Sequence, residues 1–271
     1  MPTAAVNGIE INYERRGEGR CVLFLNGSGA TLAGTALLLA PFAERVDLLA
    51  HDQRGLGATS IPPGPYSMAD YAADALGLLD HVGWDTCSVV GVSFGGMVAQ
   101  ELGVTAPDRV DRLVLACTSP GGAGGSSYPL HELSGLSPEE RAEVGTRIMD
   151  TRFTPEWLAE HPVERAIAEM MAARADVPRS DEQRRGEAEQ LEARRHHDVW
   201  DRLPRISCPT LVACGRNDGI APLANGQAIA SRVPKAELRV YDGGHAFFAQ
   251  DPRALPDLVA YVAEPSGGSA G

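Results

Sequence analysis

Three residues whose types can work together in nucleophilic catalysis each follow a short apolar run. Ser93 comes directly after Val89–Val92, and Asp218 and His245 each come shortly after a later run of the same kind. A serine hydroxyl is a poor nucleophile at neutral pH, so it needs a base within hydrogen-bonding reach, and that base needs a group that fixes its tautomer. Serine, histidine and aspartate can fill these three roles. The sequence therefore predicts attack on a carbonyl carbon by an activated hydroxyl.

Ser93 lies in the pattern G-x-S-x-G at residues 91–95, which a helix-like stretch follows at Met97–Leu102. A serine at a sharp turn from strand to helix stands at the helix N-terminus, where free N–H groups and the helix dipole favour developing negative charge. In so tight a turn, side chains at Gly91 and Gly95 would collide with neighbouring backbone, and the serine itself adopts strained backbone angles. We therefore predict that Ser93 is the nucleophile.

The base and the acid are predicted from their positions along the chain. His245 follows the predicted last strand, Glu237–Tyr241, and Asp218 follows the predicted strand Pro209–Gly215. Because the carboxyl ends of parallel strands lie at one edge of a sheet, both side chains are expected to reach the edge where Ser93 lies. The chain order serine, aspartate, histidine is the order found in enzymes with this strand–turn–helix motif.

Asp242 is a second candidate for the acid. It lies three residues before His245 and is followed by two glycines, a context typical of a turn-forming aspartate. We therefore assign the acid to Asp218 and expect Asp242 to form a turn.

Attack on a carbonyl creates an oxyanion that needs two N–H donors aimed at it. One is predicted to be the backbone N–H of Phe94, the residue after the nucleophile. The other is expected from the loop after the apolar run Cys21–Leu25, with the N–H of Ser28 as first choice and that of Gly29 as second. Glycines in this loop let the backbone approach a substrate closely.

Short apolar runs alternate with helix-like stretches over most of the chain. Continuous runs such as Cys21–Leu25 suit strands buried on both faces, which occur in parallel sheets covered by helices. The Asn-Gly pair at 7–8 predicts a hairpin turn, and helical periodicity over Met68–Val82 is expected to stop at Gly83. The sequence therefore predicts an α/β fold with a mostly parallel, twisted sheet flanked by helices.

The alternation is interrupted after the predicted strand Arg112–Cys117. Residues 119–126 are rich in glycine and are expected to be a flexible link. Ser137-Pro138 and Thr154-Pro155 are typical of helix N-termini, and the Arg- and Glu-rich stretch Arg179–Arg195 is expected to be a solvated helix face with ion pairs. The predicted division is a first core part at 1–118, a helical cap at 119–203, a second core part at 204–264 and a disordered tail at 265–271.

Charge and hydropathy exclude some classes of partner. The chain has 271 residues and a formal net charge of -12, which repels nucleic-acid phosphate and anionic lipid. No apolar run approaches the roughly 20 residues of a membrane span, and Met1–Ala5 carries no secretory signal. We therefore expect a cytoplasmic protein that acts on a small molecule, without a nucleic-acid or membrane partner.

Cysteine and histidine spacing gives no sign of a metal or a disulfide framework. The five cysteines are scattered without a C-x-x-C pair, so they are expected to be reduced thiols, with Cys117 and Cys214 buried at strand ends. His196 and His197 are adjacent, and on a helix their side chains diverge. We expect neither a metal nor a cofactor.

Together these motifs resemble those of the α/β-hydrolase superfamily over essentially the full length of the chain. The matching segments are residues 26–29, 52–57, 91–96, 215–218 and 243–245. Within the superfamily the chain is similar to the small capped lactonases, esterases and carbon–carbon hydrolases, of which the 3-oxoadipate enol-lactonases are representative. Ser93 distinguishes it from the haloalkane dehalogenases and epoxide hydrolases, which have aspartate at that position.

Two loops need comment against this resemblance. Most relatives have His-Gly where this chain has Asn26-Gly27, so the hydrogen bonding of the pocket is expected to differ while hydrolysis is kept. Asp52 and Arg54 are expected to make an internal ion pair and hydrogen bonds rather than to contact substrate.

The residues and the resemblance together predict a serine hydrolase that cleaves a small carboxylic ester or lactone through an acyl-enzyme. The substrate itself and the oligomeric state are not predicted, because the cap and the loops set specificity. Three alternatives stay open. They are hydrolysis of a carbon–carbon bond in a diketone or dienoate by the same triad, cofactor-free formation of peracids, and a ligand receptor built on a hydrolase fold.

Overall fold

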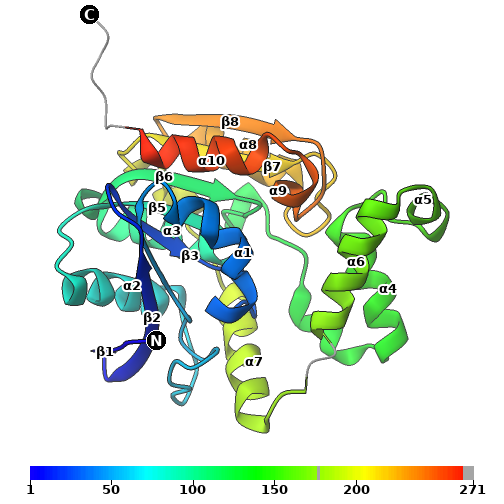
Figure 1. Ribbon diagram of the computed structural model, residues 1–271, viewed down its shortest axis with the longest axis horizontal. Coiled ribbons are helices and arrows are strands. Elements are labelled where there is room, and N and C mark those ends of the chain that lie inside the picture. Colours follow the sequence, from blue (N-terminus) through cyan, green and yellow to red (C-terminus); the bar gives the residue numbers. More distant parts are fainter. Residues whose placement is uncertain (176–177, 265–271) are drawn as a thin grey trace, which may run out of the picture.

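An eight-stranded sheet forms the centre of the molecule (Figure 1). The computed structural model describes residues 1–175 and 178–264. The strands are β1 (Thr3–Val6), β2 (Ile9–Arg16), β3 (Cys21–Leu25), β4 (Asp47–His51), β5 (Cys87–Val92), β6 (Val110–Ala116), β7 (Thr210–Gly215) and β8 (Ala236–Tyr241). Their order in the sheet is β1-β2-β4-β3-β5-β6-β7-β8. Strand β2 pairs antiparallel with β1 and β4, and the remaining neighbours pair parallel.

Helices follow most of the strands. They are α1 (Leu32–Ala43), α2 (Met68–Val82), α3 (Phe94–Thr105), α4 (Pro138–Met149), α5 (Pro155–Glu160), α6 (Pro162–Ala175), α7 (Asp181–Arg195), α8 (Leu223–Arg232), α9 (Phe247–Gln250) and α10 (Ala254–Ala263). Short 3-10 helices are η1 (Pro107–Arg109), η2 (Gly122–Gly124), η3 (Leu130–Gly135) and η4 (Trp200–Arg205).

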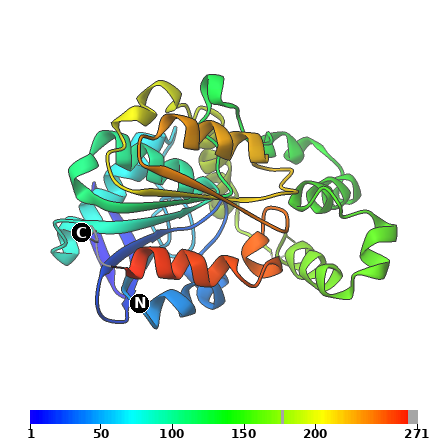
Figure 2. The same cartoon turned by 90° about the horizontal axis from the view of Figure 1, so that it is seen from above.

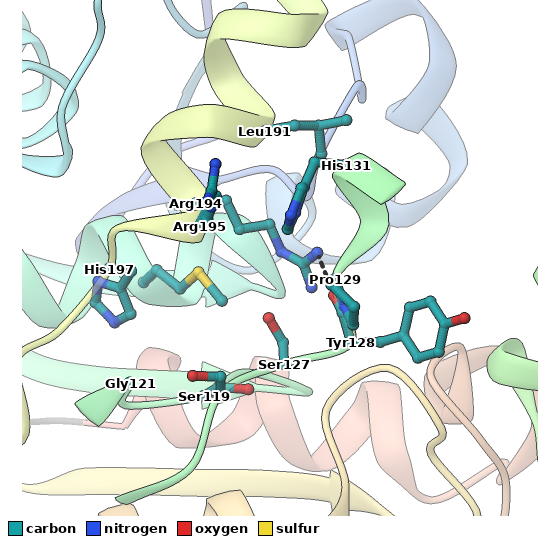
Figure 3. A pocket seen from close by; sticks show the side chains of 12 residues that line it. Ser119, Gly121, Ser127, Tyr128, Pro129, His131, Leu191, Arg194, Arg195 and His197 are labelled. Atoms are coloured by element: carbon teal, nitrogen blue, oxygen red, sulfur yellow. Dashed lines mark hydrogen bonds between the residues drawn. The ribbon is translucent and has the colours of Figure 1, made fainter. Parts of the chain in front are cut away.

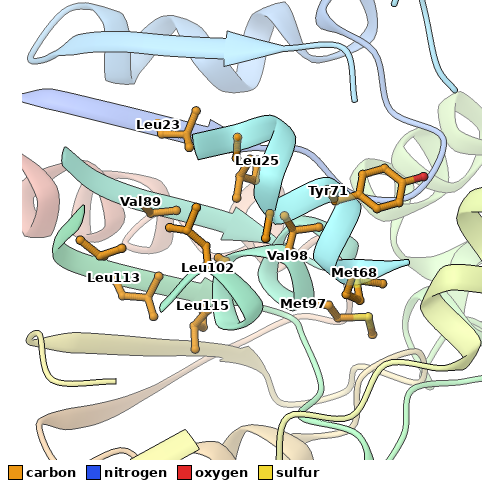
Figure 4. Close-up of a cluster of buried hydrophobic side chains, with 14 of the residues drawn as sticks. Leu23, Leu25, Met68, Tyr71, Val89, Met97, Val98, Leu102, Leu113 and Leu115 are labelled. Carbon is orange, nitrogen blue, oxygen red and sulfur yellow. The ribbon is translucent and has the colours of Figure 1, made fainter. Parts of the chain in front are cut away.

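The sheet is covered by helices on both faces. Successive strand residues point to opposite faces, and apolar residues of the same strand therefore pack on both sides of the sheet. Leu23 and Leu25 of β3 belong to a buried cluster with side chains of α2 and α3 (Figure 4). Val22 and Phe24 of the same strand belong to a second cluster with α1 and α10. Each such buried side chain stabilises the fold by about 2 kcal/mol. The predicted α/β architecture with a mostly parallel sheet is confirmed.

Two local predictions in the N-terminal half are also confirmed. Asn7 and Gly8 have φ of 48° and 75°, as the two-residue turn between β1 and β2 requires. Helix α2 begins with a reciprocal pair of bonds, in which Ser67 Oγ accepts the N–H of Asp70 and the Asp70 carboxylate accepts the N–H of Ser67. The helix ends at Gly83, whose φ is 75°.

The segment between β6 and β7 contains α4 to α7. Figures 1 and 2 show α4, α5 and α6 as a lobe beside one end of the sheet. The predicted N-caps of this segment are present, since Ser137 accepts the N–H of Glu140 and Thr154 accepts that of Trp157. The boundaries 119–203 of a cap remain a prediction.

The glycine-rich segment at 119–126 is packed, so the expectation of a flexible link is wrong. A Cβ placed on Gly121 would lie 2.0 Å from the carbonyl oxygen of His197. Gly121 also forms an isolated β-bridge with Asp198. The glycine therefore permits close backbone contact with the chain that follows α7.

Helix α7 differs in part from the solvated face expected for it. Its exposed side carries ion pairs such as Arg184 with Asp181, as predicted. Its other side is buried and consists of Gly186, Gln190, Ala193 and Arg194. The expectation is thus confirmed for one side of the helix and wrong for the other. The predicted tail at 265–271 lies outside the described residues.

Candidate active site

Ser93 lies at the turn between β5 and α3. Its φ and ψ are 55° and -114°, a strained conformation for a residue with a side chain. A Cβ placed on Gly91 would lie 2.5 Å from the carbonyl oxygen of Gly95, and one placed on Gly95 would lie 2.0 Å from that of Leu25. Close backbone approach therefore requires glycine at both positions, as the pattern predicts.

Ser93, His245 and Asp218 form a continuous hydrogen-bonded chain. Nε2 of His245 is 2.9 Å from Oγ of Ser93, and its Nδ1 is 2.8 Å from Oδ2 of Asp218. Oδ1 of Asp218 accepts the backbone N–H groups of Ile220 and Ala221, each at 2.8 Å. Because a carboxylate only accepts, Nδ1 of His245 carries the hydrogen, and Nε2 is left to accept the hydroxyl of Ser93. The side chain of Asp218 is 0% exposed and that of His245 is 12% exposed.

Asp242 lies away from this chain. Its side chain is 72% exposed, and its Oδ1 is 3.0 Å from Nη1 of Arg152. Its backbone N–H donates to the carboxylate of Asp251 at 3.0 Å. These contacts fit the turn role expected for Asp242 and leave Asp218 as the carboxylate at the imidazole.

The loop after β3 lies against the nucleophile. A Cβ placed on Gly27 would lie 3.5 Å from Cβ of Ser93, an ordinary contact distance. The N–H of Gly29 donates to Oε1 of Gln190 on α7 at 2.8 Å, so it is already occupied. Helix α7 therefore contacts the loop that is predicted to supply an oxyanion donor.

Two backbone N–H groups, one following Ser93 in the chain and one in the loop after β3, are left without an acceptor in the described part of the chain. They are those of Ser28 and Phe94, the two predicted donors. Phe94 is the first residue of α3, where the helix itself supplies no partner for the N–H. Free N–H groups near a nucleophilic hydroxyl can stabilise an oxyanion that forms on its carbonyl target.

The C-terminal end of α4 holds the two loops that carry the histidine and the aspartate. The carbonyl oxygen of Met149 accepts the N–H of His245 at 2.6 Å, and that of Ile148 accepts the N–H of Gly219 at 3.0 Å. No sequence pattern connected this helix end with the site, because the contact is made by backbone atoms.

Asp150 extends this connection through side chains. It is buried, with a side-chain exposure of 1%, and its Oδ2 accepts from Arg152 at 2.6 Å and from Nε2 of Gln250 at 2.9 Å. Oε1 of Gln250 in turn accepts the N–H of Gly244, the neighbour of His245, at 2.9 Å. The loop that carries the imidazole is therefore fixed from both sides.

A cavity of about 200 Å³ lies between the first turn of α3, the segment at 119–131 and the C-terminal end of α7 (Figure 3). Met97 lines it, and the N–H of Met97 donates to the carbonyl oxygen of Ser93 at 3.3 Å. Ser93 itself is not part of the lining. Of the lining residues, Met97 lies one helical turn after the nucleophile in the chain.

Asp52 and Arg54 are internal, as expected. Oδ1 of Asp52 accepts the N–H of Leu32 at 2.7 Å, and Arg54 holds Asp74 through two bonds of 2.7 and 2.8 Å. The carboxylate partner of Arg54 therefore comes from α2. The side-chain amide nitrogen of Asn26, where most relatives have histidine, is buried without a partner in the described part of the chain.

The cysteines and the histidine pair also follow expectation. Burial raises the pKa of Cys214 to about 12 and that of Cys117 well above its ordinary value, so both are neutral thiols. His196 is exposed and contacts Glu192 at 2.8 Å, whereas His197 is buried.

Within 1–175 and 178–264, no three His, Cys, Asp or Glu side chains could hold a metal ion together. No helix in these ranges has the length and apolar character to cross a membrane.

Comparison with known proteins identifies the family. Residues 21–252 match the family described as alpha/beta hydrolase fold. The chain is 27% identical to 3-oxoadipate enol-lactonase 2 of Acinetobacter baylyi over 96% of this chain and 95% of that protein. It is 30% identical to poly(3-hydroxyalkanoate) depolymerase of Ectopseudomonas oleovorans over 88% and 82% of the two chains. The solved enol-lactonase from Burkholderia xenovorans LB400 has the same fold, with a TM-score of 0.79 at 24% identity over 97% and 100% of the chains. The chain therefore belongs to the alpha/beta hydrolase fold family and is a hydrolase that resembles the enol-lactonases.

Proposed function

We propose that this protein is a serine hydrolase that cleaves a small carboxylic ester or lactone through an acyl-enzyme. The observation that carries the proposal is the hydrogen-bonded chain from Oγ of Ser93 through His245 to Asp218. Similarity to an enol-lactonase over nearly the whole chain supports an ester-type bond as the target. The mechanism needs no cofactor, because the three side chains supply the nucleophile, the base and the orienting group.

In the first half of the reaction, His245 takes the hydroxyl proton as Ser93 attacks the carbonyl carbon. The N–H groups of Phe94 and Ser28 stabilise the oxyanion of the tetrahedral intermediate. His245 then gives the proton to the leaving alcohol oxygen, and the acyl-enzyme remains. In the second half, His245 deprotonates a water molecule, which attacks the acyl carbon. His245 then returns the proton to Oγ of Ser93 as the bond between Oγ and the acyl carbon breaks and the acid is released. Asp218 stabilises the imidazolium in both halves.

The test is the variant Ser93→Ala, assayed on p-nitrophenyl esters and lactones of graded acyl length. Turnover is expected to fall by about a thousandfold or more while the fold is kept, because the nucleophile is lost. Ser231→Ala is the matched control, since Ser231 is exposed on α8 and its hydroxyl donates within its own helix, to the carbonyl of Ala228. Near-normal activity of the Ser93→Ala variant would refute the proposal.

Hydrolysis of a carbon–carbon bond in a diketone or dienoate would use the same triad. Product analysis separates the two reactions, by comparing a vinylogous diketone with a simple ester at equal enzyme concentration. A higher kcat/KM on the ester is expected. The chain is 27% identical to the enol-lactonase of Acinetobacter baylyi and 21% identical to a meta-cleavage product hydrolase from Pseudomonas fluorescens IP01. If the enzyme cleaves only the diketone, the bond that it hydrolyses is a carbon–carbon bond, and the proposed ester or lactone substrate is wrong.

We also propose that residues 119–203 act as a cap on a core formed by 1–118 and 204–264. Two contacts support this division, those of α4 with the loops of His245 and Gly219 and that of Gln190 with the loop of Gly29. A cytoplasmic location completes the proposal, and five cysteines without a disulfide support it.

A further inference from the structure

Gln190 is a buried glutamine of α7 that reaches the loop between β3 and α1. It is 1% exposed, and its Oε1 accepts the backbone N–H of Gly29 at 2.8 Å. Its Nε2 is buried and has no hydrogen-bond partner in the described part of the chain. An unpaired buried amide nitrogen carries a cost in free energy that an apolar side chain of the same size avoids. Packing alone therefore does not account for a glutamine at this position, whereas the bond to Gly29 does.

The bond from Gln190 is made to the centre of a four-residue turn. The turn spans residues 27–30 and is closed by a bond of 3.2 Å from the N–H of its last residue to the carbonyl oxygen of its first. Gly29 is its third residue and has a φ of 65°, as a type II turn requires. Turns of types I and II differ in the orientation of the peptide between the second and third residues, here Ser28 and Gly29. Gln190 holds the N–H of this peptide and so favours one of its two orientations.

The same turn lies against the nucleophile. A Cβ placed on Gly27, the first residue of the turn, would lie 3.5 Å from Cβ of Ser93. The second residue is Ser28, whose N–H has no acceptor in the described part of the chain. A donor stabilises an oxyanion well only when it is held in position before the charge develops. Because a flip of the next peptide would change the ψ of Ser28, the bond from Gln190 steadies the backbone that carries this N–H.

Helix α7 gives Gln190 a fixed position, because the helix is anchored on both sides of it. Four residues earlier, a Cβ placed on Gly186 would lie 2.1 Å from the carbonyl oxygen of Gly55, so the two backbones are in close contact. Four residues later, Nη1 of Arg194 donates to the carbonyl oxygen of Tyr128 at 3.0 Å. Residues at this spacing share one side of a helix. The side chain that holds the turn is therefore held in place itself.

We propose that Gln190 is a positioning residue, which fixes the turn at 27–30 so that the N–H of Ser28 faces the oxyanion formed at Ser93. The proposal rests on the proposed function, because it concerns the oxyanion of the same reaction. Gln190 acts only through the backbone of the turn and takes no part in the proton transfers of His245. By occupying the N–H of Gly29, it also leaves Ser28 as the donor of this loop.

The test is the variant Gln190→Met, which keeps a side chain of similar length without the amide. On the p-nitrophenyl ester that the wild type hydrolyses fastest, kcat is expected to fall by about tenfold and KM to change by less than about twofold. The oxyanion exists only in the transition state and the intermediate, so its donor affects kcat rather than ground-state binding. The loss is smaller than the hundredfold or more that follows removal of an oxyanion donor, because the N–H of Ser28 is loosened and not deleted.

Gln183→Met is the matched control. Gln183 is exposed on the same helix, and its Oε1 also accepts a backbone N–H, that of Ser180, at 2.9 Å. Its kcat and KM are expected to equal those of the wild type. Equal losses of kcat in the two variants would overturn the proposal, because the effect would then come from a weakened α7. Wild-type kcat in Gln190→Met, or a rise in KM alone, would overturn it as well and leave the hydrolase function intact.

A fluorophosphonate gives a second readout that does not depend on which ester is the substrate. Oγ of Ser93 attacks the phosphorus, fluoride leaves, and the phosphoryl oxygen takes the place of the oxyanion. The rate constant of labelling, followed by mass spectrometry, is expected to fall by about tenfold in Gln190→Met and to stay unchanged in Gln183→Met. A wild type that is not labelled at Ser93 would refute the proposed function and this proposal with it. Wild-type labelling rates in both variants would overturn the role of Gln190 alone.

Circular dichroism and urea denaturation check that each variant is folded. If Gln190→Met is not, Gln190→Asn replaces it, because its amide is one carbon shorter and does not reach the N–H of Gly29. The same losses in kcat and in the labelling rate are then expected. Full kcat in Gln190→Asn would contradict the proposal.

Discussion

The carboxyl edge of the sheet and the cavity beside α7 are neighbours, yet their polar groups are satisfied in different ways. At the edge, both ring nitrogens of His245 and both oxygens of Asp218 are bonded. In the cavity, only one guanidinium nitrogen of Arg194 has a hydrogen-bond partner in the described part of the chain. A fully bonded network fixes the positions of its members, whereas an unpaired buried polar group carries a cost in free energy. The edge is therefore a fixed network of bonded side chains, whereas the cavity contains polar groups that the described part of the chain leaves unpaired.

Breaking the complete network should have the largest effect. In Asp218→Asn the carboxylate becomes an amide, and one of its two polar atoms is then a donor that cannot accept the hydrogen on Nδ1 of His245. The imidazole therefore loses its fixed tautomer. We expect kcat/KM to fall by about ten thousandfold with the fold retained. Asp242→Asn is the control, because Asp242 is the other aspartate near His245, and it should change kcat/KM by less than about twofold. Similar losses in the two variants would show that Asp218 has no special role, and circular dichroism checks the fold.

The next effect comes from the backbone that holds this edge together. In Gly95→Ala the new Cβ would lie 2.0 Å from the carbonyl oxygen of Leu25, so the loop that carries Ser28 must shift. We expect a loss of about 3 kcal/mol in the free energy of unfolding, measured by urea denaturation. Gly145→Ala is the matched control within α4, where a Cβ meets nothing within 4 Å, and it should stabilise by about 0.5 to 1 kcal/mol. A mild effect of Gly95→Ala would contradict the close approach.

The edge could be predicted from the sequence because its signals are local. Ser93 follows its predicted strand directly, Asp218 and His245 follow theirs within a few residues, and the glycines around Ser93 reflect backbone geometry that any such turn requires. Once the runs were assigned to parallel strands, the sheet itself brought the three side chains to one edge. Gly27 and Ser28 were placed in the same way, because they are the second and third residues after β3.

The cavity could not be predicted, because its signals are tertiary. In the sequence, Arg194 is one of several arginines in a run rich in Arg and Glu, and nothing in its type separates it from the ion-paired Arg184. The buried side of α7 is set by where the helix crosses the core. A Cβ on Gly186 would lie 2.1 Å from the carbonyl oxygen of Gly55, a residue far away in the sequence. A glycine in the run, Gly186, is compatible with a close contact, but the sequence does not show which residue it contacts.

The buried histidines predict how the free energy of unfolding depends on pH. Burial lowers the pKa of His197 to about 4 from an ordinary 6.5, although Glu101 and the backbone of Ser119 act in the opposite direction. Below pH 6.5 the unfolded chain binds a proton that the folded chain does not, so stability falls as the pH drops from 6.5 toward 4. His51, whose pKa is also about 4, adds a similar loss.

For His197 alone the loss at pH 5 is about 2 kcal/mol. The variant His197→Gln cannot take up this proton, so the difference in unfolding free energy between pH 7 and pH 5 should shrink by about that amount. Urea denaturation at the two pH values measures it. An unchanged difference would mean that His197 is protonated in the folded state, and its cavity would then be more polar than its burial suggests.

The smallest effect we predict lies where the lobe meets the edge. Asp150 holds Gln250, and Gln250 holds the N–H of Gly244 beside His245. In Asp150→Asn the charge-assisted contact with Arg152 is lost, so the imidazole is positioned less firmly, and we expect about a tenfold loss in kcat with little change in KM. Asp242→Asn is again the control, since Asp242 also contacts Arg152 but lies exposed. If both variants keep full kcat, the lobe does not position the histidine, and its connection to the chemistry runs only through the backbone of α4.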